Sequence, residues 1–147
     1  MLDKKFIGHA LPSATWQVEK GRLRFFAKAI GESNPLYLSE EAAKAAGHRS
    51  LLAPPTFLFG AELDTGIIES CLSLLGVPIE RILHGEQQFT YHAPVYAGDT
   101  LTLEARISDI YDKKAGKMEF IVKESRYLNQ DGQLVLESRS VIVVRNP

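Results

Sequence analysis

The sequence predicts an α+β domain in which one curved antiparallel sheet wraps around a central apolar helix. The first indication is the stretch 51–63, which is apolar on nearly every side and would have to be covered on every side as a helix. The second is the alternation of apolar and polar residues over 83–144, which is typical of half-buried strands. The third is the turn at residues 129–132, whose Asp-Gly pair favours a tight hairpin.

The composition indicates one ordinary domain spanning residues 1–147. The chain is 45% hydrophobic and 24% charged with a net charge of −1, so it has enough apolar residues for a core and no charge excess that would suit nucleic acid. The apolar stretch 51–63 is shorter than the roughly 20 residues that span a bilayer, so no membrane association is expected. The single cysteine, Cys71, cannot form an internal disulfide, and the first five residues lack the apolar region of a signal peptide. We therefore expect a cytoplasmic protein, with Cys71 as a small buried hydrophobe.

Helices are expected in the first half of the chain. Apolar residues at spacings of three and four predict a helix over 18–30 that ends at Gly31. Ser39 is expected to cap a short Ala-rich helix ending at Gly47. The central helix is expected over 51–63, because its two prolines are tolerated in a first turn. Another helix is predicted over 67–75, and residues 1–17 are expected to be irregular.

Strands are expected in the second half. Alternation predicts strands over 83–92, 101–107, 118–122 and 134–144, with turns at 97–99 and 113–116. The run 141–144 is apolar on both faces, as expected of a central strand.

Two polar groups in the first half are candidates for function. The loop 32–37 lies between two predicted helices that would hold it still. Alternatively, the loop is simply a turn in which the side chain of Asn34 forms hydrogen bonds with nearby backbone groups. The second group is a basic helix face, which would suit an acidic carrier protein or a nucleotide phosphate, although a solvated helix face is the more common explanation. The basic residues are Lys20, Arg22, Arg24 and Lys28.

Three separated segments carry a resemblance to a known family. They are 31–37 (Gly-Glu-Ser-Asn-Pro-Leu-Tyr), 49–60, and 94–101 (Pro-Val-Tyr-Ala-Gly-Asp-Thr-Leu), the last similar to a Pro-Val-x-x-Gly-Asp-x-Leu motif. Over nearly its whole length the chain resembles the MaoC-like (R)-3-hydroxyacyl thioester dehydratases and hydratases. These have the hot-dog fold, in which an antiparallel sheet wraps a central helix. The segment 83–92 is typical of the branch called the FAS1-like, or N-terminal MaoC, dehydratase domain.

The resemblance implies an acyl thioester of CoA or of acyl carrier protein as the ligand, and no cofactor. Dehydration of a 3-hydroxyacyl thioester requires a base, an acid and donors that stabilise charge on the thioester oxygen. In active members, an Asp and a His of an Asp-x-Asn-Pro-(Leu or Ile)-His loop transfer the protons. A His-Gly step at the start of the central helix supplies a backbone N–H to the oxyanion.

This chain departs from that pattern at three positions. Glu32 stands at the Asp position and Tyr37 at the His position, while Asn34 and Pro35 match. A carboxylate displaced by about 1 Å can cost on the order of a hundredfold in rate, and tyrosine is a poor base near neutral pH. The His-Gly step corresponds to Ala53-Pro54, and proline has no N–H to donate.

These departures predict a catalytically weak or silent subunit that binds the acyl chain and completes a dehydratase with a catalytic MaoC-type partner. The resemblance implies this arrangement from the heterodimeric dehydratases of bacterial long-chain fatty acid elongation, and a homodimer in isolation would be compatible with it. The apolar side chains of the site, including Leu63, would fit a sealed core equally well. The implied substrate-binding residues are Asn34, Pro54, Thr56, Phe57, Leu58 and Phe59.

Three alternatives remain open. A self-sufficient hydratase would take its acid and base from His84, Glu86 and His92, which alternation places on one strand face. A thioesterase, similar only in fold, would use Glu62 or Asp64 on the central helix. The simpler expectation is that both carboxylates mark the solvated end of that helix. A non-enzymatic acyl-thioester binding subunit would share every sequence feature with the substrate-holding subunit of a dehydratase. No metal site is expected, because the histidines and the cysteine lack ligand-like spacing.

Overall fold

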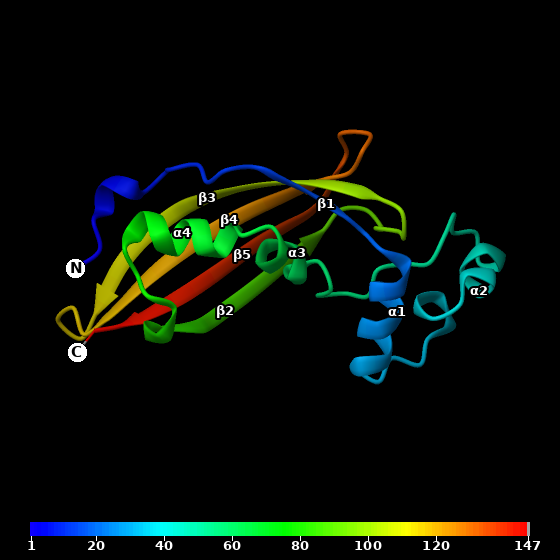
Figure 1. Ribbon diagram of the computed structural model, residues 1–147, viewed down its shortest axis with the longest axis horizontal. Helices are drawn as coiled ribbons and strands as arrows, with labels where there is room; N and C mark the ends of the chain where they lie inside the picture. Colours follow the sequence, from blue (N-terminus) through cyan, green and yellow to red (C-terminus); the bar gives the residue numbers. More distant parts are fainter. Residues whose placement is uncertain (147) are drawn as a thin grey trace.

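A five-stranded antiparallel sheet curves around two consecutive helices in the computed structural model, which describes residues 1–146 (Figure 1). The sheet order is β1-β3-β4-β5-β2, so β5 is an interior strand, as its apolar run predicted. This confirms the predicted α+β architecture. The strands are β1 Ala14–Gln17, β2 Ile82–Tyr91, β3 Thr100–Lys113, β4 Met118–Leu128 and β5 Leu134–Arg145.

The helices form two groups. α3 and α4 lie along one face of the sheet, whereas α1 and α2 stand beyond one end of it (Figure 1). Ser39 caps α2, because its hydroxyl accepts from the N–H of Ala42 at 3.3 Å, as predicted. The helices are α1 Lys20–Ala29, α2 Glu40–Ala45, α3 Phe59–Asp64 and α4 Ile67–Leu75.

The prediction of one helix over 51–63 is wrong, because α3 covers only the last part of that stretch. The N–H of Ala53 donates to the carbonyl of Val95 at 2.8 Å, and the N–H of Ala97 donates to the carbonyl of Leu51 at 2.9 Å. These bonds hold the first residues of the stretch in an extended form. The residue that precedes a proline is also disfavoured in a helix. A turn then leads into α3.

Two further expectations need correction. The face of α3 turned away from the sheet is not covered, since Leu63 is 49% exposed. The segment 1–17 is not wholly irregular, because β1 pairs with β3 from Ala14 to Gln17. Within β1 the indole of Trp16 is buried and its Nε1 donates to Asp64 at 2.9 Å. β1 therefore ties the edge of the sheet to the end of α3.

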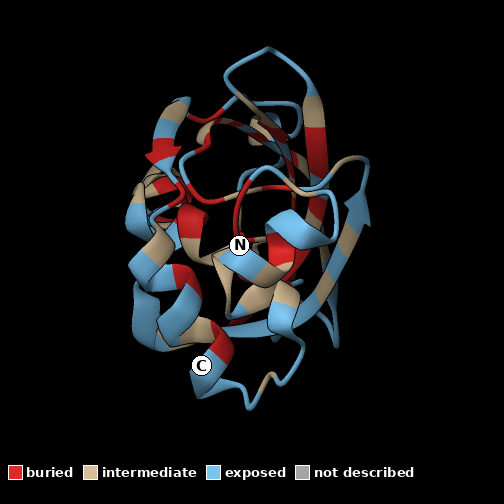
Figure 2. Cartoon of the chain, turned by 90° about the vertical axis from the view of Figure 1, so that its right-hand side faces the viewer, coloured by how far each residue is buried: buried red, intermediate tan, exposed pale blue. Residues whose placement is uncertain are grey.

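The hydrophobic core lies between the sheet and the helices, where the buried residues gather (Figure 2). Alternate residues of the strands face α3 and α4, which is why the period-two pattern of the sequence predicted the sheet. Core members from strands and helices include Leu103, Ile107, Ile121, Leu136, Ile67 and Leu72.

A buried ion pair fastens α3 to the middle of the sheet. The ammonium of Lys123 on β4 contacts the carboxylate of Glu62, and both side chains are essentially inaccessible to solvent. The hydroxyl of Tyr127 donates to Glu62 Oε1 at 3.0 Å, and Lys123 also donates to Ser125 Oγ at 3.2 Å. Burial, and then the charge of Glu62, raise the pKa of Tyr127 well above its usual range, so its hydroxyl stays protonated. Every polar atom of this cluster therefore has a partner.

Breaking this ion pair is expected to destabilise the protein strongly. Lys123→Met leaves the carboxylate of Glu62 buried and unpaired, so the free energy of unfolding should fall by about 3–5 kcal/mol in urea denaturation. The double variant Glu62→Gln/Lys123→Met leaves no unpaired charge and should lose less than Lys123→Met. As a control, Glu124→Gln breaks the exposed pair with Arg106 and should cost about 1 kcal/mol or less. A loss from Lys123→Met as small as that of the control would contradict this account.

The thiol of Cys71 is expected to be unreactive in the folded protein. Burial raises its pKa to about 11, so little thiolate is present at pH 8, and the side chain is fully buried. A chromogenic disulfide reagent should therefore react with Cys71 only after the protein is denatured. Rapid, stoichiometric reaction of the native protein at pH 8 would show that the α4 side of the core opens readily.

Candidate functional site

The polar side chains of the loop 32–37 fold back on their own backbone. Glu32 Oε1 accepts from the N–H groups of Ser33 at 2.9 Å and Asn34 at 2.8 Å. Asn34 Oδ1 accepts from the N–H of Leu36 at 3.1 Å and caps the short 3-10 helix Pro35–Tyr37. This is the turn interpretation of Asn34. As it stands, the loop uses Glu32 and Asn34 for its own structure.

The loop lies against the approach to α3. The N–H of Leu52 donates to the carbonyl of Leu36 at 3.3 Å, so the loop and the segment before α3 are in contact. Tyr37, at the end of the loop, is half-buried, and Pro54 is buried. The structure therefore places the Glu32–Tyr37 loop next to the segment that leads to the two prolines.

The backbone before α3 offers little to an oxyanion. Pro54 and Pro55 have no N–H, so the next backbone donor along the chain is Thr56. Thr56 has a φ of 72°, in the left-handed region, and its N–H donates to the hydroxyl of Tyr91 on β2 at 3.1 Å. That donor is therefore already occupied within the protein.

The apolar residues expected to line the acyl site, Phe57, Leu58 and Phe59, divide into two groups. Phe57 and Leu58 are sealed in the core, and the ring of Phe57 packs against Trp16 and Phe26, with centroids 5.4 and 5.3 Å apart. Phe59 is half-buried and stacks on the imidazole of His84, with centroids 5.1 Å apart. Of these three residues, Phe59 is the one with a partly exposed side chain.

The expectation that His84, Glu86 and His92 share one strand face is wrong. The register of β2 against β5 shifts between His84 and Glu86, which is a β-bulge at Gly85. His84 turns toward α3, whereas the other two turn to the outer face. There the carboxylate of Glu86 lies 3.6 Å from Arg139, and His92 Nε2 lies 2.7 Å from Glu137 Oε2. These three side chains cannot form one acid–base group.

The carboxylates of α3 are both engaged. Glu62 does not mark a solvated helix end, because it is fully buried in the ion pair with Lys123. Asp64 is exposed, as expected, but it accepts from Trp16 and forms an ion pair with Arg22, and this lowers its pKa mainly through the Arg22 contact. A thioesterase would need one of these carboxylates free at the surface of its site, and neither is free.

The motif at 94–101 has a structural role that its sequence did not reveal. Asp99 is fully buried, and its Oδ2 accepts from the N–H of Tyr96 at 2.8 Å. Its Oδ1 accepts from Gln130 Nε2 at 3.0 Å and contacts the guanidinium of Arg49, which also lies over the ring of Tyr96. The motif thus joins the β4–β5 hairpin to the segment before α3. No local pattern could have paired Arg49 with Asp99.

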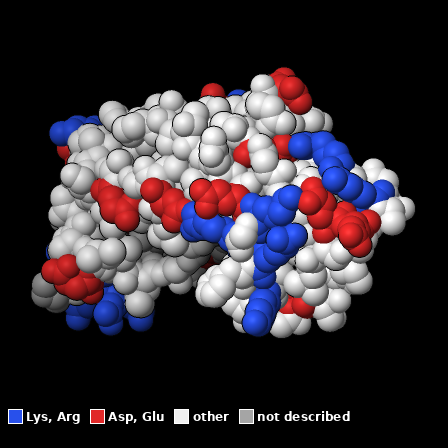
Figure 3. Space-filling model, turned by 45° about the vertical axis from the view of Figure 1, so that its right-hand side comes forward, with Lys and Arg blue, Asp and Glu red and all other residues white. Residues whose placement is uncertain are grey.

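The basic residues of α1 are partly neutralised. Lys20 pairs with Glu40 at 2.5 Å, and Arg22 pairs with Asp64. Figure 3 brings the end of the molecule that carries α1 forward, and basic and acidic side chains alternate on it. This agrees with a solvated helix face.

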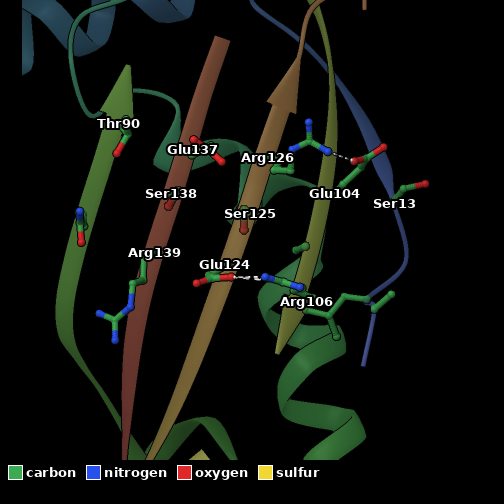
Figure 4. Close-up of a pocket in the computed structure, with 14 residues that line it drawn as sticks. Ser13, Thr90, Glu104, Arg106, Glu124, Ser125, Arg126, Glu137, Ser138 and Arg139 are labelled. Carbon is green, nitrogen blue, oxygen red and sulfur yellow. Dashed lines mark hydrogen bonds and ion pairs between the residues drawn. The ribbon is translucent and has the colours of Figure 1, made fainter. Parts of the chain in front are cut away.

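The outer face of the sheet carries a hollow of about 820 Å³ (Figure 4). It is lined by cross-strand pairs of opposite charge such as Arg106 with Glu124 at 2.8 Å and Arg126 with Glu104 at 3.6 Å. Because these charges neutralise one another, the hollow has no excess charge that would attract a charged ligand. Sequence reasoning did not find it, because the charges come from three strands.

Residues 1–146 contain neither a cluster of metal-ligating side chains nor a helix that could span a membrane. No group of three or more His, Cys, Asp or Glu side chains in this range is placed to hold a metal ion. Within the same residues, no helix has the length and apolar character needed to cross a membrane.

Comparison with known proteins identifies the family. A family model for the FAS1-like dehydratase domain region matches residues 5–138. A UPF0336 protein of Parafrankia sp. (strain EAN1pec) is 38% identical over 145 residues, which cover 98% of this chain and 95% of the relative.

Solved structures have the same fold. The HadBC (3R-hydroxyacyl-ACP dehydratase) complex from Mycobacterium tuberculosis contains a chain that is 28% identical, with a TM-score of 0.82, and the match covers 94% of this chain and 96% of that one. A MaoC-like dehydratase from Rhodospirillum rubrum is 26% identical with a TM-score of 0.71, covering 96% and 94%. The chain therefore belongs to the FAS1-like dehydratase domain family of MaoC-like hot-dog proteins.

Proposed function

We propose that this chain is the substrate-holding subunit of a MaoC-type (R)-3-hydroxyacyl thioester dehydratase or enoyl hydratase. It binds an acyl thioester of CoA or of acyl carrier protein in fatty acid metabolism. Alone it is catalytically weak or silent, and a catalytic MaoC-type subunit supplies the acid and base.

The observation that carries this proposal is the state of the groups at the family's reactive positions, where the Glu32 carboxylate and the Thr56 N–H are already bound within the protein. The carboxylate of Glu32 caps its own loop, and Tyr37 stands where the family has a histidine. The first backbone N–H after the two prolines is bound by Tyr91. Dehydration needs a proton-transfer pair and an oxyanion donor, and this arrangement presents neither ready for use.

A free sheet edge supports the idea of a partner subunit. β2 is ten residues long, and among residues 1–146 its one strand partner is β5, so within this range its other side carries backbone groups that no strand pairs. Such an edge is a template for strand pairing with another chain. Leu83 and Tyr91 on β2 are 49% and 52% exposed. The HadBC neighbour is itself a complex of two subunits, which fits the proposal.

The thioesterase alternative has little support. A carboxylate that attacks a thioester, or activates water against it, must reach the ligand. The side chain of Glu62 points from α3 into the core and is fully buried, and the carboxylate of Asp64 is bound by Trp16 and Arg22.

The protein alone should not hydrate crotonyl-CoA, or a longer 2-enoyl-CoA, at an ordinary enzymatic rate. We expect hydration, or a shift toward longer chains, only when a catalytic MaoC-type subunit from the same cell is added. The measurement is the loss of enoyl thioester absorbance with each protein alone and with the two mixed. Efficient hydration by this chain alone would contradict the proposal.

Removing the altered proton-transfer groups should not change the activity of the complex. Glu32→Gln and Tyr37→Phe keep the shape of each side chain and remove its acid–base chemistry, so the kcat of the complex should stay within about threefold of the wild-type value. A loss of a hundredfold or more is typical of a missing acid or base and would place the chemistry in this subunit.

A further inference from the structure

His84 is held in one orientation by the local geometry of β2. A Cβ atom on Gly85 would lie 2.7 Å from Val143 Cγ2 and 3.1 Å from the carbonyl oxygen of Val141, so glycine is required there. The bulge at this glycine turns His84 to the helix side and Glu86 to the outer side. Bulges commonly redirect a side chain next to a functional site. The ring of Phe59 on α3 then covers one face of the imidazole.

The hydrogen bonds of His84 fix its tautomer. Its Nε2 lies 3.2 Å from the backbone carbonyl oxygen of Glu86 and 3.1 Å from Gln87 Oε1. A carbonyl oxygen only accepts, so Nε2 carries the proton of the neutral ring and Nδ1 keeps its lone pair. Both hydrogen bonds of the ring to residues 1–146 use Nε2. His84 is exposed, and Nδ1 is its remaining acceptor.

A second layer holds Gln87 in place. Its Nε2 donates to Ser138 Oγ at 2.7 Å, and its Oε1 accepts from Ser140 Oγ at 2.8 Å. Both serines are buried, at 4% and 2% exposure, on strand positions that elsewhere carry apolar core residues. Buried hydroxyls are unfavourable unless they are hydrogen-bonded. The two serines hold the amide of Gln87, and Gln87 in turn orients the exposed imidazole of His84. Functional side chains are commonly held in this way by hydrogen bonds from residues behind them.

We propose that His84 is a substrate-binding residue whose Nδ1 accepts a hydrogen bond from an amide N–H of the pantetheine arm of the acyl thioester. This inference rests on the proposed function. The thioester group itself can only accept, so the donors nearest to it are the 3-hydroxyl group of the acyl chain and the amide N–H and hydroxyl groups of the arm. The arm is common to CoA and to acyl carrier protein. The exposed position of His84 at the edge of the α3–β2 face suits the arm rather than the reacting carbon atoms.

His84 acts here as an acceptor and not as an acid or base. The partners of Nε2 are neutral carbonyl oxygens, whereas a catalytic histidine is usually supported by a carboxylate that stabilises the imidazolium. The carboxylate of the neighbouring Glu86 lies on the opposite face of the sheet, toward Arg139.

Binding to the purified chain tests the proposal, with crotonyl-CoA and crotonyl-pantetheine as probes. His84→Ala removes the acceptor and should raise the Kd of both probes by about three- to tenfold, which is the worth of one neutral hydrogen bond. His84→Asn offers an amide oxygen near the position of Nδ1 and should stay within about threefold of wild type. Gln88→Ala, on the outer face of the same strand, is the matched control and should bind as wild type does. Thermal denaturation of each variant checks that it is folded.

A spectroscopic measurement reports on His84 directly. In the free protein, ¹⁵N chemical shifts of the imidazole should show the Nε2–H tautomer. Saturation with crotonyl-pantetheine should shift the Nδ1 resonance, because that atom gains a donor. An Nδ1 resonance unchanged at saturation would overturn the proposal.

The outcomes separate this inference from the proposed function. If wild type binds both probes and His84→Ala binds them equally well, the role of His84 is wrong and the proposed function stands. If wild type binds neither probe, alone or with its catalytic partner, both proposals are overturned. If His84→Asn lowers the kcat of the complex as much as His84→Ala does, with KM unchanged, then His84 transfers a proton and the acceptor role is wrong.

Discussion

The ion pair between Glu62 and Lys123 is the contact on which the arrangement of the site depends. It joins α3 to an interior strand where both side chains are closed to solvent, so each charge requires the other. Because α3 is only six residues long, few other contacts set its position over the sheet. The turn before α3 and the ring of Phe59 take their places from that anchor. The approach to the helix is fixed in turn by Leu51 and Ala53, which are bonded to residues 95 and 97.

With α3 fixed, the proposed site has two sides: a loop side whose polar groups are bound within the protein, and a β2 side whose polar groups orient one histidine. On the loop side, Glu32 and Asn34 are used to shape their own turn, and the prolines remove backbone donors. On the β2 side, a bulge, a glutamine and two buried serines orient one histidine beside Phe59. A substrate-holding subunit would need side chains that orient a binding residue, and it would not need groups that transfer protons.

The sequence predicted the sheet, the hairpin and the helices α1, α2 and α4, because their periodicity and capping are local properties. It misplaced the start of α3, since the bonds that keep residues 51–53 extended come from a segment more than forty residues later in the chain. It could not find the partner of Glu62, because Lys123 is 61 residues away and resembles any solvent-facing lysine of an alternating strand. The bulge at Gly85 shifted the face of every later residue of β2, so simple alternation assigned His84 and Glu86 to the same side.

The most direct test of the central claim is exchange of the α-proton of a bound acyl thioester. Purified protein would be mixed with 3-hydroxybutyryl-CoA in deuterated water, and binding and deuterium incorporation at C2 would be followed together by NMR. We expect saturable binding without deuterium incorporation above the rate in buffer. Incorporation at an enzymatic rate by the protein alone would show a working base in this chain and would contradict its assignment as the substrate-holding subunit.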